Sequence, residues 1–177
     1  FFDVGISEEH MMVYAAGMAA SGMRPVVCIY STFLQRAADQ VMHDICLSKL
    51  PVLIAIDRAG FVGEDGETHH GLFDIPWLRT IPDIEIAAPR DIIDLEFFVE
   101  EWLKKGTPFA IRYPRGNAVP SLPDNAESKE RSPQKWGKCE ILKHGKNICL
   151  IGIGSTVKLM LDASEAINRY CGAEVTV

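Results

Sequence analysis

Short apolar runs alternate with longer amphipathic stretches along the first part of the chain. Four runs have strand character, at residues 25–30, 52–56, 84–87 and 109–111. Their near-continuous apolar character is typical of strands that are buried on both faces of a parallel sheet. The pattern therefore predicts a parallel sheet rather than an antiparallel one with a solvated face.

Helical patterns separate these runs. Residues 8–21 are rich in Ala and Met and stop at Gly22, a natural end for a helix. A second helix is expected over residues 31–47, and a third over residues 91–105. Strands that alternate with helices predict an α/β fold, with a mostly parallel sheet flanked by helices and right-handed crossovers.

The first ten residues hold a candidate catalytic acid. Residues 1–4 have the character of a short buried strand, and a turn at Gly5 leads to Glu8 and Glu9 at the start of a helix. The helix dipole stabilises negative charge there. Open α/β sheets also bind their ligands at the carboxyl ends of strands. The local pattern leaves open whether these acids only begin a helix or act in catalysis.

Residues 117–137 interrupt the alternation. This segment holds several prolines among Ser, Asp, Glu and Lys, which is typical of a linker. A strand, a helix and a second strand are expected after it, within residues 147–177, and such a unit alone cannot bury both of its faces. We therefore expect one domain at residues 1–116, a linker at 117–137, and the truncated start of a second α/β domain at 138–177.

Composition narrows the class of protein. The chain has 177 residues, 47% of them hydrophobic, which suffices for a sizeable core. A net charge of −6 without a basic run disfavours nucleic-acid binding. No apolar run approaches the roughly 20 residues that span a membrane. The composition therefore predicts neither a nucleic-acid partner nor a membrane partner.

The five cysteines are widely spaced and form no C-x-x-C pair. This spacing favours reduced thiols in a cytosol-like compartment and disfavours a zinc site, so we expect no metal ligands. Cys28 and Cys149 lie in apolar runs, and we expect both of them in the core.

The first of four polar clusters covers residues 30–36 and begins where a predicted strand ends. Tyr30 is the last residue of that strand. Phe33 and Arg36 are three residues apart and so share a helix face. An aromatic ring and a guanidinium on one face suit a planar ring and an anionic group. A buried Phe beside a surface Arg explains the same pattern.

The second cluster covers residues 57–71, a long polar loop with four glycines. Loops of this length inside compact domains are usually functional. Arg58, Asp65 and the adjacent His69 and His70 are its candidate functional residues. The histidine pair lacks a third ligand at helical spacing, so it is not a metal signature. Structural and functional roles for these histidines remain equally supported by the pattern.

The third and fourth clusters are turns. Residues 112–116 place Arg115 between a proline and a glycine. The planar fork of arginine suits a phosphate or carboxylate. A turn at the sheet edge with solvated charges explains the pattern equally well. Residues 152–156 form a glycine turn at a helix start but lack the P-loop lysine, which favours a simple strand-to-helix turn. Because each cluster follows a predicted strand, we expect all four at one edge of the sheet.

Several of these motifs together resemble a known family. Those at residues 5–10, 30–36, 56–71 and 112–116 occur in this order. They are similar to the 1-deoxy-D-xylulose-5-phosphate synthases, thiamine-diphosphate enzymes of the transketolase superfamily. The resemblance implies a transferase that condenses pyruvate with glyceraldehyde 3-phosphate and releases carbon dioxide, in the first step of the non-mevalonate isoprenoid pathway. The product also feeds thiamine and pyridoxal synthesis.

The resemblance assigns the cofactor contacts by position. Glu8 would hydrogen-bond N1′ of the aminopyrimidine ring and so promote activation of the cofactor. Phe33 would stack on that ring, with Tyr30 beside it. The family usually has glutamine at the position of Glu9, so the paired carboxylates are a departure, and Glu9 is expected to act only on the helix dipole or a partner.

The resemblance also assigns the substrate contacts. Asp65 and His69 would contact substrate oxygens and assist proton transfers. The residues that would surround the substrate and hold its phosphate are Tyr30, Arg36, Arg58 and Arg115.

The family protein is several times longer than this chain. Its N-terminal domain binds magnesium and the cofactor diphosphate, and the first elements of the pyrimidine-binding domain are also missing here. The resemblance therefore implies a fragment that is inactive alone, from a homodimeric protein of the bacterial cytoplasm or a plastid. Two alternatives stay open: a β-type subunit of a 2-oxo-acid dehydrogenase, and a non-catalytic interaction module.

Overall fold

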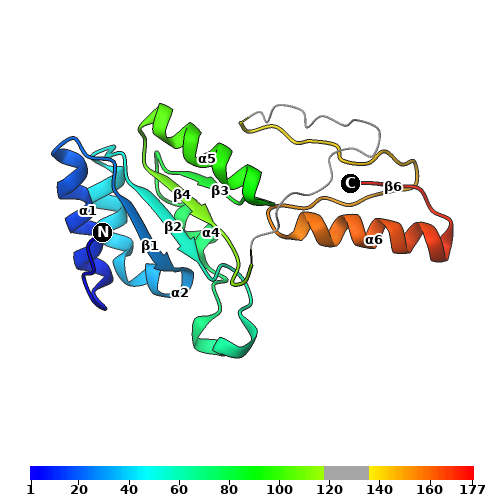
Figure 1. Ribbon diagram of the computed structural model, residues 1–177, viewed down its shortest axis with the longest axis horizontal. Coiled ribbons are helices and arrows are strands. Elements are labelled where there is room, and N and C mark those ends of the chain that lie inside the picture. Colours follow the sequence, from blue (N-terminus) through cyan, green and yellow to red (C-terminus); the bar gives the residue numbers. More distant parts are fainter. Residues whose placement is uncertain (118–135) are drawn as a thin grey trace. The chain divides into compact units, whose positions relative to one another are not determined.

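A computed structural model of the chain describes residues 1–117 and 136–177 (Figure 1). The chain divides into two compact units. The first comprises residues 1–88 and 98–117. The second comprises residues 89–97 together with the described residues from 136 onward.

The first unit is built on a four-stranded sheet in the order β1–β2–β4–β3 (Figure 1). The strands are β1 (Val26–Tyr30), β2 (Leu53–Asp57), β3 (Glu85–Ala87) and β4 (Phe109–Arg112). Every pairing between neighbours is parallel. The predicted α/β class and the parallel sheet are therefore confirmed, and all four carboxyl ends lie at one edge.

The sheet has apolar side chains on both faces, as the near-continuous apolar runs predict. Side chains alternate between the faces of a strand. On one face, α1 (Glu8–Ala20) packs with its residues Met12, Ala15, Ala16 and Ala19 against a buried cluster. The strand residues of that cluster are Val27, Ile29, Ile54, Ile56 and Ala110. The alternate residues Leu53, Phe109 and Ile111 are buried as well.

The helix expected over residues 31–47 is continuous only in part. The chain forms α2 (Ser31–Leu34), the 3₁₀ turn η1 (Gln35–Ala37), α3 (Ala38–Gln40) and the π-helical turn η2 (Val41–Cys46). The prediction of one regular helix was wrong because Ala37 leaves helical geometry, with φ −105° and ψ 23°. Such 3₁₀ and π segments often accompany functional sites.

The long loop after β2 is more ordered than its glycines indicate. It contains the 3₁₀ turns η3 (Gly63–Asp65) and η4 (Glu67–His69) and leads into α4 (Asp74–Leu78), which the sequence pattern did not predict. Reciprocal backbone hydrogen bonds of 2.7 and 2.8 Å between Gly60 and Gly71 close the loop at its neck. The loop is therefore a closed projection from the sheet edge (Figure 1).

The helix α5 (Ile92–Lys105) confirms the third predicted helix. Its part from residue 98 onward belongs to the first unit and carries Trp102, which is almost fully buried. The helix stops at Gly106, whose amide bonds to the Trp102 carbonyl at 2.9 Å and whose φ is +66°. Glycine adopts this left-handed geometry without strain.

The second unit contains β5 (Ile148–Cys149), α6 (Thr156–Cys171) and β6 (Val175–Thr176). The two strands pair in parallel in a sheet of their own. The turn at residues 152–156 thus does not belong to the four-stranded sheet, and the expectation that it shares that sheet's edge was wrong. The predicted domain limits stay a prediction, since most of the linker at 117–137 lies outside the described residues.

Two further expectations were wrong. Residues 1–4 form no strand, and Phe1 and Phe2 are exposed, because this segment pairs with no strand of the described sheet. Cys28 and Cys149 are exposed rather than in the core. Cys28 lies on edge strand β1, on the face opposite the buried cluster. Within the described parts of the chain, no helix has the length and apolar character needed to cross a membrane.

The central strand should be the part of the sheet most sensitive to truncation. Ile54 is fully buried in β2, so Ile54→Ala is expected to lower the free energy of unfolding by about 2–5 kcal/mol. Val26 is 52% exposed, so Val26→Ala should change it by no more than about 0.5 kcal/mol. Urea unfolding of both variants measures the difference, and equal effects would contradict the assigned core.

Candidate active site

Three of the four polar clusters leave the sheet at the same edge. Tyr30 and Asp57 are paired residues at the ends of β1 and β2, and Arg112 ends β4. Because these strands are parallel, the segments that follow them begin side by side. The prediction of a shared edge is confirmed for the clusters at residues 30–36, 57–71 and 112–116.

Glu8 and Arg36 meet at a cleft beside the start of α1. The Arg36 Nη1 donates a hydrogen bond to Glu8 Oε1 at 2.8 Å. The Glu8 side chain is 13% exposed and that of Arg36 is 53% exposed. The cleft has a volume of about 420 Å³ and is lined by residues 6–10 and by Arg36. A larger hollow of about 560 Å³ is lined by none of the predicted site residues.

Arg36 connects this cleft to a cluster of three rings. Its guanidinium lies over the Phe33 ring, 4.7 Å from the centroid, as the three-residue spacing predicts. Phe33 stacks with Tyr30 at 5.8 Å and an interplanar angle of 22°. His69 meets Phe33 edge-on at 5.3 Å. The glycine-rich loop therefore supplies a ring to the aromatic pair that β1 and α2 provide.

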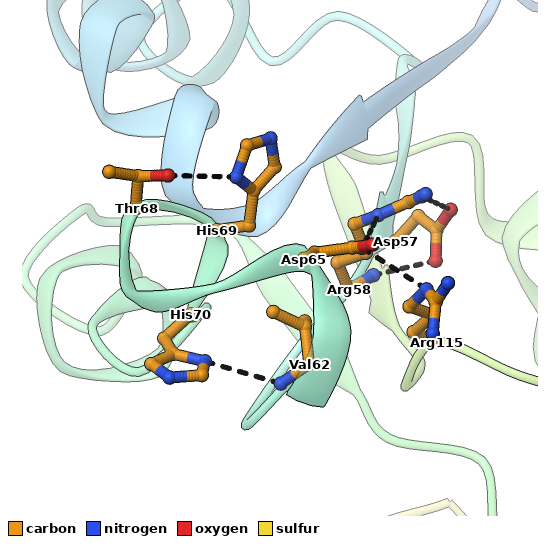
Figure 2. Close-up of polar contacts among 8 residues, drawn as sticks. All are labelled: Asp57, Arg58, Val62, Asp65, Thr68, His69, His70 and Arg115. Atoms are coloured by element: carbon orange, nitrogen blue, oxygen red, sulfur yellow. Dashed lines mark hydrogen bonds and ion pairs between the residues drawn. The ribbon is translucent and has the colours of Figure 1, made fainter.

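Two contacts of Thr68 position His69. The Thr68 hydroxyl lies 2.9 Å from His69 Nδ1 (Figure 2). The Thr32 hydroxyl donates to the Thr68 carbonyl at 3.1 Å, which ties the loop to α2. His70, by contrast, accepts a hydrogen bond from the Val62 amide at 3.2 Å and so bridges positions within the loop. The two adjacent histidines therefore have different contacts, and His69 is the one in the ring cluster.

Arg58 joins the rings to a second acidic residue. Its guanidinium lies 3.8 Å from the centroid of the Tyr30 ring. Its Nε donates to Asp65 Oδ2 at 2.7 Å, and the Arg115 Nε approaches the same oxygen at 3.1 Å (Figure 2). One carboxylate therefore holds two arginines that come from different loops.

The charges in this group reinforce one another. The hydrogen bond from Arg58 is the main cause that lowers the pKa of Asp65 below its ordinary value, and the nearby Arg115 and His69 act in the same direction. The same hydrogen bond raises the pKa of Arg58. Asp65 is thus a carboxylate at neutral pH, which suits an acceptor and an anchor for cations.

Asp57 has a positioning role that the sequence pattern did not assign. Its Oδ1 accepts from the Arg58 amide at 2.6 Å, and its Oδ2 accepts from Arg58 Nη1 at 2.9 Å (Figure 2). Arg58 has a φ of +57°, in the left-handed region that side chains other than glycine rarely adopt. Asp57 therefore stabilises both the unusual backbone and the side-chain direction of Arg58. An Asp–Arg pair directly at a strand end was the available signal.

Further missed residues fix the end of the loop. The side chain of Asp74 is almost fully buried and accepts from Arg112 Nε at 2.8 Å, which joins α4 to the end of β4. At Gly71, an added Cβ would collide with the Arg58 carbonyl and the Ser31 side chain. A bulkier residue there would displace Arg58, so this close approach requires glycine.

The structure thus brings the predicted site residues of the first unit, apart from His70, into one connected group. Contacts run from the cleft at α1 through the rings to the paired arginines. The residues in this order are Glu8, Arg36, Phe33, Tyr30, Arg58, Asp65 and Arg115, and His69 joins the group at the two rings.

The group combines a partly buried carboxylate, an aromatic platform and three arginines. Such a set can hold a planar nitrogen ring by hydrogen bonding and stacking, and an anion by guanidinium forks. Across residues 1–117 and 136–177, no group of three His, Cys, Asp or Glu residues is placed to hold a metal ion. The roles of the individual residues stay predictions.

The lowered pKa of Asp65 predicts a pH-dependent contribution to stability. The ionised carboxylate stabilises the folded state, so the contribution is present above the ordinary pKa of 3.8 and is lost as the pH falls through the lowered value. Asp65→Asn should therefore be less stable than the wild type at pH 6, and the difference should shrink as the pH falls below about 4. Urea unfolding across this range measures it.

A matched control is Glu64→Gln, which removes an exposed charge from the same 3₁₀ turn but no acceptor of Arg58. It should lower stability less than Asp65→Asn at pH 6. A destabilisation by Asp65→Asn that stayed constant down to pH 2 would contradict the proposed ionic contact.

Comparison with curated proteins identifies similar sequences. Residues 1–120 match the family described as "Transketolase, pyrimidine binding domain". The whole chain is 49% identical to a 1-deoxy-D-xylulose-5-phosphate synthase of Dictyoglomus thermophilum, and covers 28% of that protein. It is 50% identical over its whole length to the same enzyme of Nitratidesulfovibrio vulgaris, and covers 27% of it. The chain thus spans about a quarter of the length of these curated relatives, and the resemblance found in its motifs is confirmed.

Solved structures support the fold. A transketolase of Campylobacter jejuni aligns with a TM-score of 0.81 at 22% identity, over 99% of this chain and 27% of that one. A split-gene transketolase, described as an inactive β4 tetramer, aligns with a TM-score of 0.78 at 26% identity, over 99% of this chain and 56% of that one. Together with the family match over residues 1–120, these likenesses lead to one conclusion: the chain belongs to the family of transketolase pyrimidine-binding domains.

Proposed function

We propose that the chain is the pyrimidine-binding part of a 1-deoxy-D-xylulose-5-phosphate synthase. In this function, pyruvate and glyceraldehyde 3-phosphate condense with loss of carbon dioxide, as the first step of non-mevalonate isoprenoid synthesis. The observation that carries the proposal is the single connected group from Glu8 to Arg115. Whole-chain identities of 49% and 50% to curated synthases support it.

The residues at the cleft fit the aminopyrimidine ring of thiamine diphosphate. Arg36, a planar cationic group, already makes the two contacts that the ring requires, a hydrogen bond to Glu8 and stacking on Phe33. When bound, thiamine diphosphate supplies the electron sink for decarboxylation and carbon–carbon bond formation. Glu8 would hydrogen-bond the ring nitrogen N1′, and Phe33 would hold the ring by stacking, with Tyr30 beside it.

The arginines provide the site for the anionic substrates. Arg58 and Arg115 share the Asp65 carboxylate, which orients both guanidinium groups before a ligand arrives. Their free N–H groups bind the phosphate of glyceraldehyde 3-phosphate, together with Arg36 and the Tyr30 hydroxyl. Pre-organised cations bind an anion with a smaller loss of side-chain entropy.

His69 and Asp65 contact the substrate oxygens. His69 lies 5.3 Å from the Phe33 ring, centroid to centroid, so its imidazole is close to the proposed cofactor ring. An imidazole in this place suits proton transfer to and from substrate oxygens. Asp65 is ionised and accepts hydrogen bonds from substrate hydroxyls while it holds the arginines.

The remaining parts of the proposed enzyme lie outside this chain. We assign the diphosphate and magnesium site to an N-terminal domain of the same protein, consistent with the 27–28% coverage of the relatives. We also propose that the full-length protein is a homodimer located in the cytoplasm or in a plastid. The identity to bacterial synthases favours this function over a 2-oxo-acid dehydrogenase β-type subunit or a non-catalytic module.

The role of Glu8 can be tested in the full-length protein. Glu8→Gln keeps the side-chain size but removes the carboxylate, so kcat should fall by roughly 10²- to 10⁴-fold. Glu9→Gln is the matched control, and it should retain most activity, because the family usually has glutamine there. Formation of deoxyxylulose phosphate measures both. Near-normal turnover by Glu8→Gln, with an unchanged circular-dichroism spectrum, would refute the assignment.

The isolated chain of 177 residues is expected to have no turnover. Pyruvate, glyceraldehyde 3-phosphate, thiamine diphosphate and magnesium would be added to the purified chain, with the full-length protein as the positive control. The expected result is product from the full-length protein only. Product from the isolated chain would show that its residues suffice to bind and activate the cofactor.

A further inference from the structure

Arg36 contacts both residues that the proposed function assigns to the cofactor ring. Its Nη1 donates to Glu8 Oε1 at 2.8 Å, and its guanidinium carbon lies 4.7 Å from the Phe33 ring centroid. We call this pair of contacts the Arg36 bridge. A guanidinium is planar, delocalised and rich in N–H donors, and it stacks readily on an aromatic face.

In the proposed function, the aminopyrimidine ring uses the same Glu8 carboxylate and the same Phe33 ring. Like the guanidinium, it is flat and presents nitrogen to a carboxylate. Glu8 and Phe33 lie on separate elements, α1 and α2, and the Arg36 bridge spans them at the cleft lined by residues 6–10. A ring that bonded to Glu8 and stacked on this face of Phe33 would overlap the Arg36 guanidinium. The Arg36 bridge and a ring bound in this way therefore exclude each other.

We propose that the cofactor ring displaces the Arg36 guanidinium from Glu8 and Phe33, and that the released cation then becomes available to the anionic substrate. This inference rests on the proposed function. Arg36 then pairs with Glu8 before the cofactor binds and contacts the anionic substrate afterwards. The site gains its third arginine for anion binding only after the cofactor is in place, so the cofactor should bind before the acidic substrate.

Exposure and contacts distinguish Arg36 from the other two arginines. The Arg36 side chain is 53% exposed, so its guanidinium can turn into solvent without disturbing the core. Arg58 is 21% exposed and is bonded to both Asp57 and Asp65. Arg115 shares Asp65 with it. Two arginines are therefore anchored by acids outside the cleft, whereas Arg36 is paired with the proposed catalytic carboxylate.

The Arg36 bridge also gives Glu8 a partner in the absence of cofactor. The Glu8 side chain is only 13% exposed, and an ionised carboxylate removed from water is unfavourable unless it is paired. Arg36 gives this carboxylate a cationic partner and orients it toward the cleft. Binding of the ring then exchanges one partner of Glu8 for another instead of burying a bare charge.

The exchange predicts that removal of the Arg36 guanidinium strengthens cofactor binding. In the full-length protein, Arg36→Met keeps an apolar stem but breaks no other contact of Glu8. Thiamine diphosphate with magnesium should then bind about 5- to 30-fold more tightly, the range expected for loss of an exposed ion pair and a cation–π contact. Isothermal titration calorimetry measures the Kd. The KM for glyceraldehyde 3-phosphate should rise in the same variant.

Two controls isolate the exchange. Arg79→Met removes an exposed arginine at the end of α4 and should leave the Kd of the cofactor unchanged. The second control is the diphosphate ester of the thiazolium half of the cofactor, which lacks the pyrimidine ring. It should bind the wild type and Arg36→Met with the same Kd, since it does not compete with the Arg36 bridge.

The outcomes separate this inference from the proposed function. If the wild-type protein bound no thiamine diphosphate with magnesium, the proposed function itself would fail. If the wild type bound the cofactor but Arg36→Met bound it equally or more weakly, only the exchange would be overturned. Tighter binding of the thiazolium fragment by Arg36→Met would also overturn it, because the effect would then not involve the ring.

Discussion

The position of the Arg58 guanidinium is the constraint on which most of the site depends. It lies over Tyr30 and bonds to Asp65, which in turn holds Arg115. One side chain thereby joins the end of β1, the loop after β2 and the turn after β4. Asp57 maintains this position by bonding to both the backbone and the side chain of Arg58, whose φ is +57°. The left-handed backbone of Arg58 places its amide and side chain against Asp57, and these two hydrogen bonds in turn stabilise that backbone.

The arrangement divides the proposed site into a fixed part and an adjustable part. Arg58 and Asp65 are largely shielded, with side chains 21% and 19% exposed, and both are bonded on more than one side. Arg36 is more exposed and reaches Glu8 across an open cleft. Fixed cations provide precise geometry for an anion, whereas an exposed guanidinium can change partners at small energetic expense. The two parts meet at the stacked rings of Tyr30 and Phe33.

Much of this fold was predictable because buried parallel strands produce continuous apolar runs. The four strands and the shared edge at Tyr30, Asp57 and Arg112 followed from that pattern. Residues 1–4 were misread because an apolar run forms a strand only where a partner strand can accept its hydrogen bonds. The helix break at Ala37 depends on tertiary packing, which periodicity does not report.

Site residues were predicted mainly through motifs, whereas the contacts among them were not predictable. The sequence placed Arg36 and Glu8 28 positions apart and held no signal that they would meet at 2.8 Å. The left-handed backbone of Arg58 was equally hidden, because it lies at a residue other than glycine. Such contacts arise from loop geometry in three dimensions, which single-sequence patterns do not encode.

The neck formed by Gly60 and Gly71 has a consequence for how such a site can diversify. Reciprocal backbone hydrogen bonds close the loop at its base, and Asp65, Thr68 and His69 connect the segment between them to the rest of the site. Insertions, deletions or exchanges at the other positions of that segment need not alter the strands or the residues at their ends. Changes confined to those positions can therefore vary the surface beside the site while the contacts around Glu8 are inherited unchanged.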